Sequence, residues 1–72
     1  MDIRKISIGP DYKTAMHYLV DQDVMGGSHK IHLIKFYEDL SSYRIWITDG
    51  EEIICWKEFK NMPVSIEFNT KF

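Results

Sequence analysis

The sequence predicts an α+β domain in which one helix packs on a mainly antiparallel sheet of four to five strands, in the order β-α-β-β-β-β. Three observations lead to this prediction. Residues 11–21 carry apolar side chains at helical spacing, and several later segments alternate between apolar and polar residues. The pair Asp49-Gly50 then joins two of those segments as in a tight hairpin. With 72 residues, the chain is expected to form one domain, 1–72.

The first strand is predicted at residues 2–8, and Gly9-Pro10-Asp11 follows it as a helix start signal. Within 11–21, the apolar residues recur at i, i+3, i+4, i+7 and i+8 and form one stripe: Tyr12, Ala15, Met16, Leu19 and Val20. The segment Asp23–Gly27 ends the predicted helix, because its two glycines allow a sharp reversal.

The remaining strands are predicted at 29–38, 43–48, 51–59 and 64–68. Asp49-Gly50 favours a two-residue type I′ turn, because both central residues of that turn need positive φ. This turn places Thr48 opposite Glu51, and Trp46 opposite Ile53.

The predicted hairpin has two faces. One face is expected to meet the helix as core: Tyr43, Ile45, Ile47, Ile54 and Trp56. The other face collects a mixed set: Arg44, Trp46, Thr48, Ile53, Cys55, Lys57 and Phe59. An apolar patch rimmed by cations is typical of an interface, so Trp46, Ile53 and Phe59 are the predicted interface residues. The alternative is a longer turn, which would shift the register and put Trp46 and Trp56 on one face.

Composition limits the class of partner. Nine Lys and Arg against eleven Asp and Glu give a formal charge of −2, which argues against binding to long nucleic acids. No apolar run reaches the roughly 18 residues of a membrane helix, and the first residues do not lead into a signal-peptide core. We therefore expect a cytoplasmic protein without membrane contact. Because so short a chain builds a small core, a homo-oligomer is also expected.

Catalytic and metal motifs of known spacing are absent from the sequence, so no enzyme, metal or cofactor is predicted. His29 and His32 are three residues apart on a strand and so fall on opposite faces. The single Cys55 is interpreted as a small strand hydrophobe rather than a nucleophile.

Two glycine-containing turns are candidates for an anion site, and each also fits an ordinary structural role. Ser7–Lys13 leads from a strand into the predicted helix N-terminus, where free amides favour an anion, although Asp11 can cap the same amides. Gly26–Lys30 offers backbone amides, a hydroxyl and an ammonium group, although it also fits an ordinary turn. Aromatic residues next to cations recur along the chain, and such sets stack bases and pair phosphates.

Most of the chain resembles small proteins encoded by bacteriophages and prophages. The resemblance runs through Ile3–Lys13, Ala15–Tyr18, Gly26–Ile34, Trp56–Phe59 and Met62–Glu67. It implies a counter-defence factor that either sequesters a nucleotide signal or blocks a host protein, and it carries over no site residue.

Two functions follow as hypotheses. In the first, a homo-oligomer sequesters a small anionic ligand such as a cyclic nucleotide, and the predicted ligand-binding residues are Lys13, His17, Arg44, Trp46 and Lys57. In the alternative, the chain is an inhibitor or adaptor that docks a host protein through its exposed sheet face.

Overall fold

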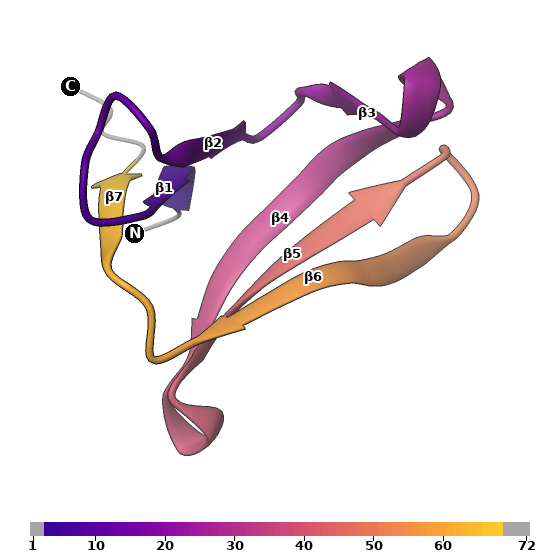
Figure 1. Cartoon of the computed structure of the whole chain (residues 1–72). Coiled ribbons are helices and arrows are strands. Elements are labelled where there is room, and N and C mark those ends of the chain that lie inside the picture. Colours follow the sequence, from indigo (N-terminus) through magenta and orange to yellow (C-terminus); the bar gives the residue numbers. More distant parts are fainter. Residues whose placement is uncertain (1–2, 69–72) are drawn as a thin grey trace, which may run out of the picture.

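The computed structural model of the chain describes residues 3–68, and this range is all-β (Figure 1). Seven strands form: β1 (Ile3–Ile8), β2 (Met16–Leu19), β3 (Asp23–Val24), β4 (His29–Tyr37), β5 (Ser42–Thr48), β6 (Ile53–Lys60) and β7 (Val64–Phe68). Two single 3₁₀ turns, η1 (Met25–Gly27) and η2 (Glu38–Leu40), flank β4. The strands make a small antiparallel sheet, β2-β1-β7, and a large one, β3-β4-β5-β6.

The predicted helix at 11–21 is wrong, and with it the α+β fold class. Only one turn forms, in which the backbone N–H of Ala15 donates to the carbonyl of Asp11 at 2.8 Å. The chain is extended from Met16 onward and pairs with β1. Pairing buries Tyr18 opposite Ile6 and leaves it 6% exposed.

The helical stripe fails because the segment also carries apolar side chains at strand spacing, at Met16, Tyr18 and Val20. Tyr18 and Val20 both contact the core as part of an extended segment, whereas Tyr12 from the stripe is exposed. In the extended form, β2 also pairs its backbone with β1. If the segment were helical, the N–H and C=O groups along that edge of β1 would lack these partners.

The segment after β2 passes from the small sheet to the large one. Asp21 adopts a positive φ of 73°, and its N–H donates to the carbonyl of Ile31 at 2.8 Å. The N–H of Ile31 donates back to the carbonyl of Gln22 at 2.9 Å. These bonds join the two sheets at a corner, so the sheets enclose one core.

The core is dominated by isoleucine. Five side chains are almost fully buried: Ile6, Ile31, Ile34, Ile45 and Ile47. Rings close one side of this cluster, where Tyr18 meets Trp56 edge-to-face at a centroid distance of 5.7 Å and lies 6.1 Å from Phe59.

The five predicted strands are confirmed as strands, with shifted ends. The prediction 2–8 corresponds to β1, with Asp2 outside the described residues, and 29–38 corresponds to β4. The predictions 43–48 and 51–59 correspond to β5 and β6, and 64–68 matches β7.

The two-residue hairpin turn is wrong. Thr48 pairs with Ile53, which leaves a four-residue connection, 49–52. The Asp49 carboxylate stabilises this longer turn, because its Oδ1 accepts from the N–H of Glu51 at 2.9 Å and of Glu52 at 3.0 Å. The register moves by two residues, so the residues next to the turn keep their predicted faces.

A register irregularity in β6 corrects the predicted faces a second time. Trp46 pairs with Cys55 but Ile45 pairs with Lys57, so Trp56 is an extra residue, as in a β-bulge. The alternation reverses after it. Phe59, predicted on the outer face, therefore packs against the core.

Candidate functional site

The large sheet has an outer face that points away from the isoleucine core. Cross-strand pairing and alternation assign twelve side chains to it: Lys30, Leu33, Lys35 and Tyr37 from β4; Ser42, Arg44, Trp46 and Thr48 from β5; Ile53, Cys55, Glu58 and Lys60 from β6. We refer to this set as the outer face. Figure 1 shows the small sheet lying to one side of the large one.

On the outer face, the Tyr37 ring contacts two cations and its hydroxyl is hydrogen-bonded to Trp46. The Trp46 indole Nε1–H donates to the Tyr37 hydroxyl at 3.0 Å. The guanidinium of Arg44 lies 5.0 Å from the centroid of the Tyr37 ring, and the Nζ of Lys35 lies 5.4 Å from the same centroid. Cations over an aromatic ring are attracted to its negative face, so these four side chains stabilise one another.

Arg44 is also fixed by a carboxylate. Its Nε donates to Glu58 Oε2 at 2.7 Å, and the Ser42 hydroxyl donates to the same oxygen at 3.2 Å. The hydrogen bond from Arg44 is the main cause that lowers the pKa of Glu58, and its counterpart raises the pKa of Arg44. The guanidinium is therefore held in place with some of its N–H donors still available.

The outer face is cationic although the chain is acidic. It carries Lys30, Lys35, Arg44 and Lys60 against the single carboxylate of Glu58, whereas the whole chain has a formal charge of −2. Positive charge around aromatic rings attracts an acidic or anionic partner and offers it apolar contact area.

The outer face continues onto a sheet edge that has no partner strand within residues 3–68. β6 is the last strand of the large sheet, and its first half is apolar and exposed: Ile53 is 54% exposed, and Ile54 and Cys55 are exposed as well. A sheet edge presents backbone N–H and C=O groups that a partner strand can pair with.

The predicted ligand-binding residues fall into three separate places. Arg44 and Trp46 lie together on the outer face, whereas His17 is on β2 of the small sheet and Lys13 precedes it in the exposed 9–15 loop. Lys57 sits at the bulge of β6, with its Nζ 4.7 Å from the Trp56 ring centroid. The five residues therefore do not form one site within a single chain.

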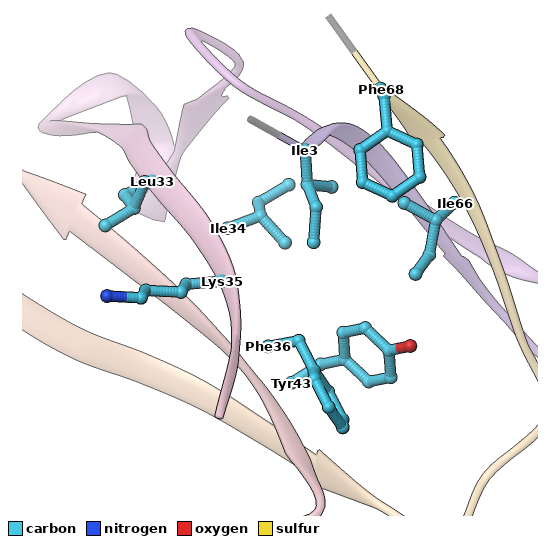
Figure 2. A pocket seen from close by; sticks show the side chains of 8 residues that line it. All are labelled: Ile3, Leu33, Ile34, Lys35, Phe36, Tyr43, Ile66 and Phe68. Carbon is cyan, nitrogen blue, oxygen red and sulfur yellow. The ribbon is translucent and has the colours of Figure 1, made fainter. Parts of the chain in front are cut away.

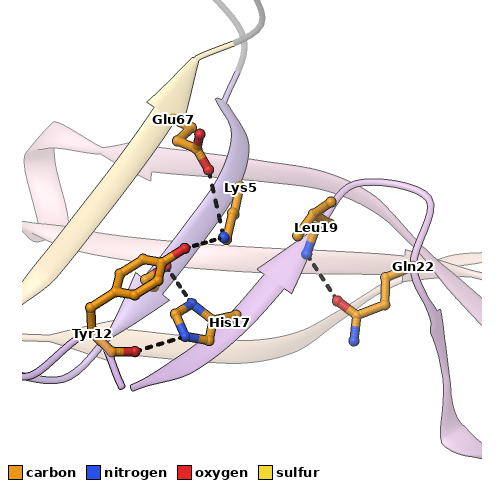
Figure 3. A network of polar contacts seen from close by, with 7 residues as sticks. Lys5, Tyr12, His17, Leu19, Gln22 and Glu67 are labelled. Atoms are coloured by element: carbon orange, nitrogen blue, oxygen red, sulfur yellow. Dashed lines mark hydrogen bonds and ion pairs between the residues drawn. The ribbon is translucent and has the colours of Figure 1, made fainter. Parts of the chain in front are cut away.

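The small sheet carries a polar network that the sequence analysis missed (Figure 3). Ser7 Oγ lies 2.7 Å from His17 Nδ1, and His17 Nε2 lies 3.0 Å from the carbonyl oxygen of Tyr12. Because a carbonyl only accepts, His17 Nε2 is the donor to Tyr12, and in the tautomer with its single hydrogen on Nε2 the Nδ1 atom accepts from the Ser7 hydroxyl. The Tyr12 hydroxyl accepts from Lys5 at 2.7 Å, and Lys5 also pairs with Glu67 at 3.7 Å.

This serine and histidine have the spacing of a nucleophile and its base, but their setting is structural. Ser7 is 4% exposed and belongs to the central strand β1, whose backbone pairs with β2 on one side and β7 on the other. The neighbouring amides are thus used within the sheet and cannot stabilise an oxyanion. The pair instead holds the 9–15 loop against the sheet.

In both turns considered as anion sites, polar groups that could bind an anion already form hydrogen bonds within the chain, and a carboxylate lies nearby. The N–H of Lys13 donates to Asp11 Oδ1 at 3.1 Å, which is the capping alternative. Near η1, Ser28 donates to the carbonyl of Met25 at 3.0 Å, and the adjacent hollow of about 360 Å³ includes Asp49 in its lining. A phosphate there would face a carboxylate.

Within residues 3–68, His, Cys, Asp and Glu side chains do not gather in a group of three that could hold a metal ion. The same part of the chain contains no helix of the length and apolar character needed to cross a membrane. Comparison with known protein families, with curated proteins and with solved structures finds no match to this chain, so its function has to be argued from its own residues.

Proposed function

We propose that this chain is a protein-binding module, an inhibitor or adaptor, that docks the acidic surface of a partner protein on the outer face of its large sheet. One observation carries the proposal: on a sheet face that points away from the core, the Tyr37 ring contacts the cations Lys35 and Arg44, and its hydroxyl accepts from the Trp46 indole. Tryptophan, tyrosine and arginine are the residues that most often dominate protein–protein binding energy.

The shape of the face favours a macromolecule over a small nucleotide. Small ligands bind in concave sites that bury most of their surface. The best-formed hollows in the described part of the chain are lined by neither Arg44 nor Trp46. A protein partner needs no such hollow, because it covers a broad surface from outside.

The anionic-ligand hypothesis stays open in one form. A nucleotide held by Arg44 and Trp46 would need a second subunit to enclose it, as the predicted homo-oligomer would provide. The test below therefore includes nucleotides, and the mass of the protein in solution is measured alongside it.

The test is an NMR titration of the ¹⁵N-labelled chain with three probes: a peptide of alternating Glu and Leu, a cyclic dinucleotide and a short oligothymidylate. We expect the acidic peptide to shift the amides of Lys35, Tyr37, Arg44 and Trp46, and to bind more weakly as salt is raised. The alkylation rate of Cys55, which is exposed in the free chain, should fall in the complex.

Matched variants make the result decisive. Trp46→Ala should weaken peptide binding at least tenfold, as expected for a central aromatic contact, whereas Tyr12→Ala in the 9–15 loop should leave it unchanged. Tighter binding of either nucleic-acid probe on the same face would replace the proposal by the anionic-ligand hypothesis. Failure of all three probes to shift this face would overturn both.

A further inference from the structure

A second hollow lies on the other side of the large sheet. It has a volume of about 530 Å³ and is formed where the end of β4 and the start of β5 face β1 and β7 (Figure 2). Its lining residues are Ile3, Leu33, Ile34, Lys35, Phe36, Tyr43, Ile66 and Phe68. These residues belong to both sheets, so the hollow is a gap in the packing between them.

The lining is apolar and aromatic. Ile3 and Ile34 are buried, whereas Phe36 and Phe68 are 43% and 47% exposed. The rings of Phe36 and Tyr43 lie 4.8 Å apart at 47°, and Phe68 and Ile66 stand across the opening from them (Figure 2). Two half-exposed phenylalanines that border one concave space leave a large apolar area in water, which a ligand could cover.

Among the described lining residues, one polar side-chain group points into the hollow, and the one charged side chain points away. The Tyr43 hydroxyl points into the space (Figure 2). The ammonium group of Lys35 points away from it and lies over the Tyr37 ring on the outer face. A charged ligand would lose its hydration there without gaining a counter-ion from the lining residues described above.

We propose that this hollow binds a small, neutral, aromatic molecule that carries one hydrogen-bonding group. The volume is in the range of small-molecule sites, about 300–1,000 Å³. The Phe36 and Tyr43 rings provide tilted and edge contacts for a planar molecule, and the Tyr43 hydroxyl accepts or donates one hydrogen bond. The site is separate from the outer face, because Phe36 and Tyr43 alternate with Tyr37 and Arg44 along the same two strands.

The test uses indole and naphthalene as probes in NMR titrations of the ¹⁵N-labelled chain. Indole has one N–H donor, whereas naphthalene has a similar shape without a polar group. We expect saturable 1:1 binding of indole, with a Kd of about 1 mM or tighter, and the largest shifts at Ile34, Phe36, Tyr43 and Ile66.

Variants test the lining directly. Phe36→Ala and Phe68→Ala remove exposed walls without touching the buried core, and each should weaken indole binding at least fivefold. Tyr43→Phe should weaken indole about fivefold and leave naphthalene unchanged. Met25→Ala removes an equally exposed apolar side chain elsewhere and should change neither. Shifts confined to Trp46 and its neighbours, or equal binding to all variants, would overturn the proposal.

Discussion

The outer face of the large sheet and the solvent-facing side of the small sheet carry similar residues but differ in what covers them. On the small sheet, Tyr12 from the 9–15 loop lies against Lys5 and His17, with its ring 4.6 Å from the His17 ring. On the large sheet, Tyr37 and Trp46 are also held by cations and hydrogen bonds, but all of these partners belong to the sheet itself. The chain thus covers the small sheet with its own 9–15 loop. Within the described residues, the rings on the outer face of the large sheet have no such loop over them and can contact a partner.

This difference separates structural residues from candidate binding residues. Ser7, His17 and Tyr12 satisfy one another and hold a loop, so we expect their loss to reduce stability. Arg44 and Trp46 lie on a surface without a covering loop in the described range, so we expect their loss to reduce binding. The following predictions test the contrast from the largest expected effect to the smallest.

The largest effect is expected from isoleucines on opposite faces of the large sheet. Ile45→Ala should lower the free energy of unfolding by about 2–5 kcal/mol, because Ile45 is fully buried and its loss leaves a cavity. Ile53→Ala, on the exposed outer face, should change it by no more than about 0.5 kcal/mol. Urea unfolding of both variants measures this. Equal losses would mean that the outer face is part of the folding core.

The next effect concerns the loop that covers the small sheet. Gly9 has a φ of 138°, and a Cβ there would lie 3.2 Å from the Ala15 Cα, so Gly9→Ala should lower stability by more than about 1 kcal/mol. Gly50→Ala is the control, because its φ of 102° is also positive but nothing lies within 4 Å of its Cβ. Thermal unfolding should show the smaller loss for Gly50→Ala. The reverse order would contradict close packing of the loop.

A smaller effect is expected at the Ser7–His17 hydrogen bond. Ser7→Ala should lower the free energy of unfolding by about 1 kcal/mol, the usual contribution of a neutral hydrogen bond. Amide exchange should quicken in the 9–15 loop and stay unchanged on the outer face. Ser65→Ala on β7 pairs opposite Ser7 but is exposed, and it should be near neutral. Faster exchange at Trp46 would show that the two faces are coupled.

The smallest effect is the dependence on pH. Backbone N–H groups of Glu52 and Glu51 lower the pKa of Asp49 below its ordinary 3.8, and Arg44 lowers the pKa of Glu58 below 4.5. Carboxylates with a lowered folded-state pKa stabilise the fold fully above their ordinary pKa, and this contribution is lost as the pH falls from that value through the folded-state pKa. Melting temperatures of the natural chain should therefore drop between pH 5 and pH 3 by more than those of Asp49→Asn combined with Glu58→Gln.

The sequence identified most strands because their alternation of apolar and polar residues agrees with their environment. In β5, Ile45 and Ile47 alternate with Arg44 and Trp46, and the two sets lie on opposite faces as predicted. The outward position of Trp46 and Ile53 was predictable for the same reason. Half of the candidate site, the aromatic and cationic face, thus follows from local patterning.

The extended form of residues 11–21 and the length of the hairpin turn could not be predicted from local patterns. Residues 11–21 satisfy both a helical and a strand spacing, and only the need of β1 for a partner selects the extended form. The length of the turn depends on hydrogen bonds from Glu51 and Glu52 to the Asp49 side chain. Strand pairing and side-chain hydrogen bonds decide both features, and the spacing of apolar residues does not record either of them.

What the sequence determined by itself is five of the seven strands described in residues 3–68, because the alternation of apolar and polar residues along each of them marks its buried face. The tertiary structure alone decided how those strands pair. It made the 11–21 segment a loop followed by a strand, and it made Trp56 an extra, bulged residue in β6. That residue moved Phe59 into the core and brought Glu58 out to Arg44. The reason is that pairing and bulges optimise hydrogen bonds and burial between segments far apart in the chain, which no local pattern records.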